Sequence, residues 1–219
     1  MILKSFGCSF IYGSDLIDDR NGKNIELANS HTWPTLLANF LGHRHECYAR
    51  PGSGNLQILE RLLEQINKGV PAVYVISWSW IDRFDYIDDT VTWPGTKWNT
   101  LLPAKNDSVT RCYYKNLNSQ YQDKLTSLIY IRDAIDTLNK NHCPFIMTYM
   151  DDLIFETQWH STSAITDLQN YVRPYMTTFE NQTFLDWSKK KGFAISNNNH
   201  PLEDAHQAAF ELIKSYNLV

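Results

Sequence analysis

Two residues near opposite ends of the sequence have the types and surroundings that nucleophilic catalysis needs. Ser9 follows a short apolar run and Gly7, which permits a tight turn, so its hydroxyl can be presented with backbone N–H groups beside it for an oxyanion. His200 stands directly before Pro201, a residue preferred in the first turn of a helix, and an imidazole there can take the serine proton near neutral pH. The plainer interpretation is that both side chains only cap helices.

A third segment, Arg50–Asn55, has the glycines of an anion-binding turn. Gly52 and Gly54 precede a helical pattern, and a glycine-lined helix start lets backbone N–H groups approach an anionic oxygen closely. An ordinary strand-to-helix turn has the same appearance. Acyl transfer through a serine, a histidine and an oxyanion turn explains all three segments together. Cys8 is a rival nucleophile, but Ser9 has the better position in its turn.

The elements that must position these segments alternate between strands and helices. Short apolar runs predict five strands, at Met1–Phe6, Glu46–Ala49, Ala72–Ser77, Phe145–Tyr149 and Phe193–Ser196. Apolar residues at helical spacing predict helices at Thr32–Leu41, Asn55–Lys68 and Gln120–Asn139, helical turns within Ser163–Lys190, and a last helix from Pro201. This order predicts an α/β fold: one domain over residues 1–219, a three-layer α/β/α sandwich around a five-stranded parallel sheet. Such sheets bind ligands beyond the carboxyl ends of their strands, which is where the three segments fall.

The overall composition excludes several classes of protein. The 219 residues carry a formal net charge of −4 and no basic run longer than Lys189–Lys191, so the clustered positive face of a nucleic-acid binder is missing. The longest apolar run is far shorter than a membrane span, and Met1–Phe6 lacks the features of a signal peptide. Four widely spaced cysteines without a CxxC motif indicate reduced thiols in a cytoplasmic protein. We therefore expect no metal or cofactor and no nucleic-acid or membrane partner, while the oligomeric state stays open.

Residues 78–118 show no sustained hydrophobic period, which predicts a long functional loop. This segment carries eight aromatic residues: Trp78, Trp80, Phe84, Tyr86, Trp93, Trp98, Tyr113 and Tyr114. Their rings either grip a sugar ring or an acyl chain opposite the catalytic edge, or pack the loop against its own domain. The predicted substrate contacts are Trp78 and Trp80, together with Asn55 at the glycine turn.

Three sequence blocks carry a resemblance to a known family. Gly7-Cys8-Ser9-Phe10, Gly52-Ser53-Gly54-Asn55 and His200-Pro201, in that order, resemble the SGNH (GDSL) hydrolases. The resemblance implies a flavodoxin-like SGNH hydrolase fold and a serine hydrolase of the esterase or deacetylase type, acting on small or carbohydrate-linked esters without a cofactor. It gives Ser9 as nucleophile, His200 as general base, and the N–H groups of Ser9 and Gly54 as oxyanion donors. The third donor in the family is an asparagine after the third strand, and Ser79 is the nearest match here.

The acid of the family's catalytic triad has no counterpart at the usual place. The family carries an aspartate two or three residues before the histidine, where this chain has Asn197 and Asn198. We expect Asn197 or Asn198 to orient the imidazole by a neutral hydrogen bond, with Asp151 or Asp152 as a substitute acid and a Ser9–His200 dyad without an acid as the alternatives. A separate group of carboxylates is expected to be solvated: Asp15, Asp18 and Asp19. The missing acid keeps a second interpretation open, a catalytically degenerate protein of this fold that serves as a ligand-binding or structural module.

Overall fold

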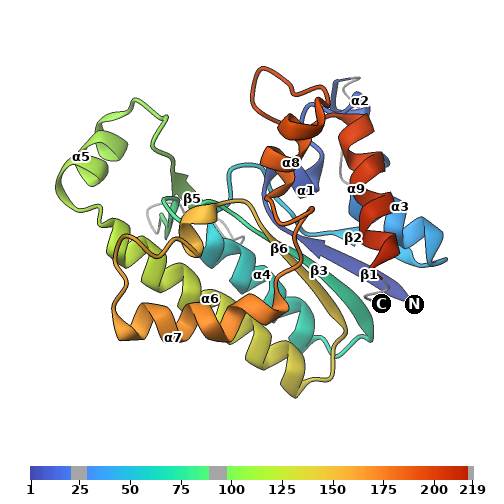
Figure 1. Ribbon diagram of the computed structural model, residues 1–219, viewed down its shortest axis with the longest axis horizontal. Coiled ribbons are helices and arrows are strands. Elements are labelled where there is room, and N and C mark those ends of the chain that lie inside the picture. The colour runs from blue at the N-terminus through green and yellow to red at the C-terminus, as the bar shows by residue number, and fades with distance from the viewer. Residues whose placement is uncertain (21–28, 89–97, 217–219) are drawn as a thin grey trace.

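Four parallel strands form the central sheet of the computed structural model, which describes residues 1–20, 29–88 and 98–216 (Figure 1). Their order across the sheet is β2-β1-β3-β6, and their bounds are β1 Ile2–Phe6, β2 Arg44–Cys47, β3 Ala72–Trp78 and β6 Phe145–Tyr149. Every residue of β3 is buried, because this charge-free strand lies between two neighbours and under both helical layers. The carboxyl ends of all four strands meet at one edge of the sheet.

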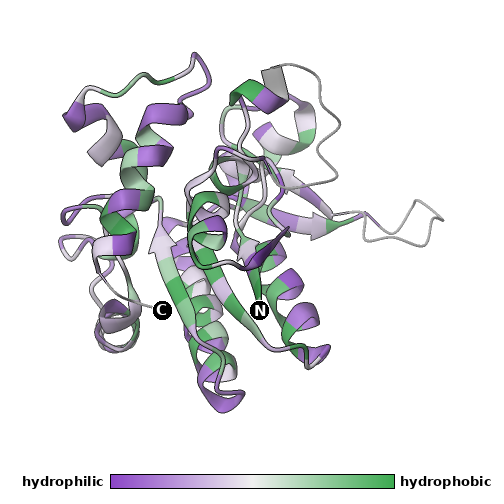
Figure 2. Cartoon of the chain, turned by 90° about the vertical axis from the view of Figure 1, so that its right-hand side faces the viewer, coloured by the Kyte–Doolittle hydropathy of each residue, from purple (hydrophilic) through white to green (hydrophobic). Residues whose placement is uncertain are grey.

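Helices cover both faces of this sheet and give the predicted three-layer arrangement. One layer consists of α4 (Asn55–Asn67), α6 (Gln120–Lys140) and α7 (Ser163–Val172). The other consists of α1 (Ser9–Tyr12), α3 (Trp33–Phe40), α8 (Phe184–Lys191) and α9 (Glu203–Ser215). Along β3, Tyr74 and Ile76 pack into the first layer, while Val73 and Val75 pack into the second. Figure 2 shows the hydrophobic residues concentrated on the strands and on the helix sides that face them.

The helices predicted from periodicity begin and end within about two residues of the observed ones. Helix α3 begins after Thr32 and has Pro34 in its first turn, as the sequence indicates. Two short 3₁₀ helices flank α7 in the sequence. η1 (Asp152–Ile154) lies between β6 and α7, and η2 (Arg173–Tyr175) lies between α7 and α8. Among the described residues, no helix is both long and apolar enough to cross a membrane.

The predicted fifth strand, Phe193–Ser196, is wrong. Only Ile195 makes a bridge, an isolated antiparallel one to Pro201, so this segment pairs with its own continuation and not with the sheet. Hydrogen bonds from Ser196 N to His200 O (2.9 Å) and from Leu202 N to Ala194 O (3.0 Å) close the hairpin-like turn. The segment therefore forms one side of the turn that holds His200 in place.

The predicted loop at 78–118 contains three further elements in its described part. Strands β4 (Phe84–Ile87) and β5 (Trp98–Leu101) form an antiparallel ribbon, and α5 (Ser108–Asn116) follows it. Four-residue strands are too short to give a hydrophobic period, which is why the sequence shows none. A short helix, α2 (Ile17–Arg20), completes the described elements. Trp93 lies outside the described residues.

Candidate active site

Ser9 begins helix α1, directly beyond the carboxyl end of β1. Gly7 is needed at the turn, because a Cβ there would lie 2.8 Å from Cγ1 of Ile11. The Ser9 N–H is in the first turn of α1, where backbone N–H groups have no acceptor within the helix. Its neighbour Cys8 is fully buried with Sγ 3.2 Å from Sδ of Met150, so the thiol packs in the core and is not presented as a nucleophile.

His200 lies against Ser9, in the contact that their common edge of the sheet predicts. Nε2 of His200 is 2.9 Å from Oγ of Ser9, a distance at which the serine proton can pass to the ring. The Phe10 ring meets the imidazole edge-on, with centroids 5.5 Å apart, and restricts its rotation. The His200 side chain remains 15% exposed, so a substrate can reach the pair.

The other ring nitrogen of His200 faces Asp15. Nδ1 of the imidazole is 2.7 Å from Oδ2 of Asp15, which corrects the expectation that this carboxylate is solvated. Helix α1 is one turn long and ends at Gly13 in the left-handed conformation, and Asp15 itself has φ of 64°. These two residues reverse the chain, so a carboxylate six positions after Ser9 returns to the histidine.

The acids and amides predicted to orient the imidazole have other roles. Asn197 is exposed and makes no hydrogen bond to the ring in the described structure. The carboxylate of Asp151 is bound by the N–H groups of Ile81 and Leu153, each at 3.0 Å, while Asp152 is exposed in η1. Burial raises the pKa of Asp151. Neither aspartate serves His200.

Asp15 is held by the loop that carries the histidine. Its Oδ2 accepts from Ser196 Oγ at 2.6 Å and from Asn198 Nδ2 at 3.1 Å. The Ser196 oxygen in turn accepts the N–H groups of Asn198 and His200, both at 3.2 Å. The hydrogen bond from Ser196, followed by those from His200 and Asn198, holds the pKa of Asp15 below its usual range. The sequence contains one signal for this arrangement, the absence of an acid before the histidine together with an acid shortly after the serine.

Gly54 is not open as an oxyanion donor in this structure. Its N–H donates to Oδ1 of Asp85 at 2.9 Å, and the N–H of Gln57 donates to Oδ2 at 3.0 Å. Asp85 thus caps helix α4 in place of a side chain that Gly54 lacks, and a Cβ on Gly54 would lie 2.5 Å from that carboxylate. The predicted role of Gly54 is therefore replaced by a contact between α4 and the β4–β5 ribbon.

Ser79, the predicted third donor, is a buried hydroxyl without a hydrogen-bond partner in the described part of the chain. It is 1% exposed, and its backbone N–H donates to Oδ1 of Asn55 at 2.7 Å. The amide of Asn55 also reaches Ser79 O and Ser127 Oγ, so this residue clamps the loop and is itself 3% exposed. The Ser79 hydroxyl therefore carries a proton that no acceptor takes up within the described part of the chain.

Of the two predicted aromatic substrate contacts, only Trp80 lies beside the pair. Trp78 is fully buried in the core between β3 and the helices, so it offers no face to a substrate, and that prediction is wrong. Trp80 is half-buried; its ring meets Phe10 edge-on at 5.6 Å, and the Arg83 guanidinium covers it at 4.5 Å. Most other rings of the segment pack locally, as Phe84 does on Tyr113.

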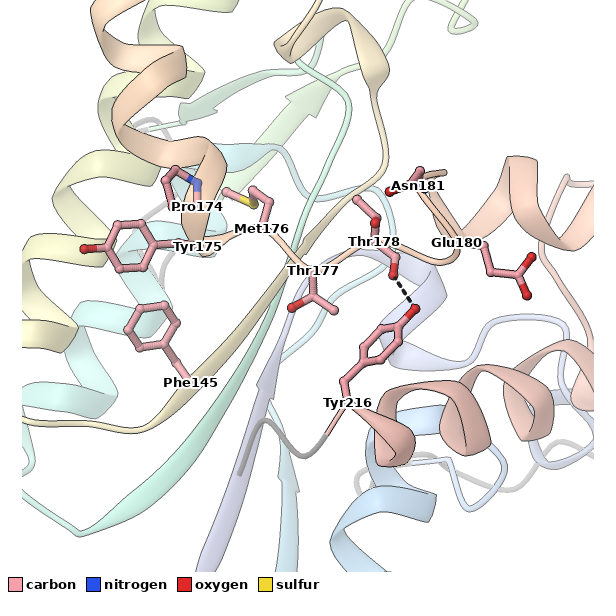
Figure 3. Close-up of a pocket in the computed structure, with 9 residues that line it drawn as sticks. All are labelled: Phe145, Pro174, Tyr175, Met176, Thr177, Thr178, Glu180, Asn181 and Tyr216. Atoms are coloured by element: carbon pink, nitrogen blue, oxygen red, sulfur yellow. Dashed lines mark hydrogen bonds between the residues drawn. The ribbon is translucent and has the colours of Figure 1, made fainter.

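The pocket drawn in Figure 3 lies away from this site. Its volume is about 580 Å³, and its lining residues include Phe145, at the amino end of β6, and Tyr216, whose hydroxyl donates to Thr178 O. Ser9 and His200 lie at the carboxyl edge of the sheet and take no part in it. Among the described residues, no three His, Cys, Asp or Glu side chains are grouped so that they could hold a metal ion.

Comparisons with known proteins identify the fold. No family model matches the sequence, and no curated protein does. A catalytic mutant of the acetylxylan esterase Axe2 from Geobacillus stearothermophilus is similar with a TM-score of 0.54 and 12% identity, over 98% of this chain and 92% of that one. A member of the lipolytic G-D-S-L family from Veillonella parvula DSM 2008 gives 0.51 and 9%, over 99% and 98%. The psychrotrophic esterase EstA from Pseudoalteromonas sp. gives 0.50 and 10%, over 98% and 97%. The chain has the SGNH hydrolase fold, as its three sequence blocks predict.

Proposed function

We propose that this protein is a serine hydrolase of esters, with Ser9 as nucleophile and His200 as general base. The observation that carries the proposal is the 2.9 Å contact between Ser9 Oγ and His200 Nε2 at the ligand-binding edge of the sheet. His200 takes the hydroxyl proton as Oγ attacks the ester carbonyl carbon, then returns it to the leaving alcohol. Water, deprotonated by the same imidazole, hydrolyses the acyl-enzyme and releases the acid.

Two donors support the oxyanion that forms during both steps. They are the N–H of Ser9, which has no acceptor within its helix, and the unpaired hydroxyl of Ser79. Gly54 adds a third donor only in a conformation in which Asp85 has withdrawn from its N–H.

The proposed substrates are small esters, such as acetyl groups on a carbohydrate. The support is twofold: esterases, one of them an acetylxylan esterase, share the fold, and the half-buried ring of Trp80 contacts Phe10, which in turn contacts His200. An aromatic ring near the nucleophile suits the apolar side of a sugar ring.

One observation favours a second candidate function. The carboxylate of Asp85 occupies the N–H of Gly54 with three further hydrogen bonds, from Gln57 N–H, Gln57 Nε2 and Thr100 Oγ1. Because the Asp85 carboxylate already occupies a predicted oxyanion donor, the site also suits a protein that binds a ligand at this edge without hydrolysing it.

A fluorophosphonate probe separates the two candidates. The hydrolase is expected to become labelled at Ser9, as read by mass spectrometry of its peptides, and to hydrolyse p-nitrophenyl acetate. Ser9→Ala is expected to remove both signals while the protein stays folded. An unlabelled wild type with background hydrolysis would leave the binding protein.

A further inference from the structure

We infer that Asp15 positions His200 for the reaction, and that Ser196 and Asn198 hold the Asp15 carboxylate in place. This inference rests on the proposed function. The acid of the site then lies in the turn after the nucleophile and not in the loop before the histidine. The loop before the histidine instead binds the carboxylate of that acid.

The first argument is geometric. Asp15 Oδ2 lies 2.7 Å from Nδ1 of His200, while Nε2 lies 2.9 Å from Oγ of Ser9. A carboxylate on Nδ1 keeps the proton on that nitrogen, so Nε2 is left as the acceptor that faces the serine. Both ring nitrogens are thereby committed, and the imidazole has one orientation that serves catalysis.

The second argument concerns charge. Asp15 accepts hydrogen bonds from neutral donors on Ser196 and Asn198, which favour the ionised carboxylate. Among the other ionisable groups nearby, His206 is fully buried and neutral because burial lowers its pKa to about 3, and Glu203 accepts the N–H of Ile17. Asp15 is thus the negative charge in contact with the imidazolium that forms during the reaction.

The third argument explains the asparagine in the loop. Asn198 Nδ2 is 3.1 Å from Asp15 Oδ2, so the position requires a hydrogen-bond donor. An aspartate there would set two carboxylates against each other, which disfavours the ionisation of both. A neutral residue before His200 is therefore expected, because the acid of the site comes from Asp15.

The first test is Asp15→Asn, which keeps the shape and removes the charge. We expect kcat for p-nitrophenyl acetate to fall by about 10³–10⁴-fold with little change in KM, as for the equivalent change in a serine protease. The acid limb of the kcat/KM profile should also move to lower pH, because the imidazolium of His200 loses its counter-charge. A loss of kcat with an unmoved acid limb would mean a structural role and overturn the inference.

In the second test, one substitution is expected to change kcat in opposite directions in two backgrounds. Asn198→Asp should lower kcat several-fold in the wild type, where it faces Asp15, and raise kcat at least about tenfold in Asp15→Asn, where it returns a carboxylate to the site. Asn197→Asp is the matched control: unlike Asn198, Asn197 makes no hydrogen bond to Asp15 or His200 in the described structure, and its substitution should leave both backgrounds within about twofold. Equal effects of Asn198→Asp in both backgrounds would contradict the inference.

A measurement that needs no turnover separates this inference from the proposed function. A proton held between Nδ1 of His200 and a carboxylate gives a strongly downfield NMR signal, expected in the wild type and in Ser9→Ala, and lost in Asp15→Asn. A protein without esterase activity that shows this signal would reject the hydrolase and keep the Asp15–His200 contact. A wild type without the signal would reject the contact, whatever its activity.

Discussion

Two serine–histidine pairs involve strand β1 and the turn that follows it, Ser5 within the strand and Ser9 just beyond its carboxyl end. Ser9 Oγ is 2.9 Å from His200 Nε2, and Ser5 Oγ is 2.8 Å from His45 Nε2. The remaining ring nitrogen also has a partner in each pair, the Asp15 carboxylate in the first and the Thr35 hydroxyl, at 2.8 Å, in the second. By distance alone the two pairs are the same.

They differ in charge and in access to solvent. Ser5 has no exposed surface, and burial lowers the pKa of His45 to about 4, so this imidazole stays neutral and cannot collect a proton near neutral pH. His200 keeps 15% of its side chain exposed and contacts a carboxylate. A serine within reach of a histidine is thus a structural hydrogen bond unless a charge stabilises the imidazolium and a substrate can enter.

The largest predicted effect separates the two serines. Ser9→Ala should reduce kcat/KM for p-nitrophenyl acetate by at least about 10³-fold, because the nucleophile is lost. Ser5→Ala should leave kcat/KM within about twofold, since Ser5 is fully buried within strand β1 and out of a substrate's reach. Comparable losses in the two variants would remove the distinction between the pairs.

The buried histidines should make the stability of the protein fall at low pH. Folded His45 binds a proton only near pH 4, whereas the unfolded residue does so near pH 6.5, so its contribution is complete above about pH 6.5 and is lost as the pH falls toward 4. The loss is about 3 kcal/mol, and His206, with its pKa lowered to about 3, adds a loss of about 5 kcal/mol that also begins near pH 6.5 and extends down to about pH 3. Urea unfolding of the wild type and His45→Gln at pH 7.5 and 4.5 checks this. The variant should lose less stability on acidification, and an equal loss would contradict the neutral state of His45.

Substitution of Ser79 tests whether its hydroxyl stabilises the oxyanion that forms during the reaction. Ser79→Ala should lower kcat by about 100-fold, the usual effect of removing one oxyanion donor. Since the hydroxyl has no partner in the described structure, the free energy of unfolding should change little or rise slightly. Unchanged kcat would exclude Ser79 from the oxyanion site and leave the Ser9 N–H as the donor there.

The smallest effect is expected at Thr35. Thr35→Val keeps the shape and removes the hydroxyl that binds Nδ1 of His45 and the carbonyl of Asn29, at a cost of about 1–3 kcal/mol in unfolding free energy. Activity should stay within about twofold. A large fall in kcat without a fall in melting temperature would mean that the buried pair communicates with the site.

The sequence predicted what local pattern controls. Ser9 and His200 stand next to strong local signals, a glycine after a strand and a proline at a helix start, so their common edge followed from the alternation of elements. Asp15 gave only an indirect signal, the missing acid before the histidine, because its role depends on a left-handed residue and on a partner 185 positions away. The cap that Asp85 places on Gly54 is also a contact between distant segments. Phe193–Ser196 has the composition of a strand, and only its pairing with its own continuation shows otherwise.

The candidate site joins the first and last parts of the chain, and this has a consequence for the order of events during synthesis. Ser9 and His200 are separated by 191 positions, so a ribosome adding about 5–20 residues per second makes the histidine roughly 10–40 s after the serine. Throughout that interval Ser9 and Asp15 lie in the nascent chain without the imidazole that connects them. The turn that carries His200 leads directly into α9, which packs against α3 in a long-range contact. The Ser9–His200 contact therefore reports on late folding, because a chain whose His200 turn is not in place cannot form it.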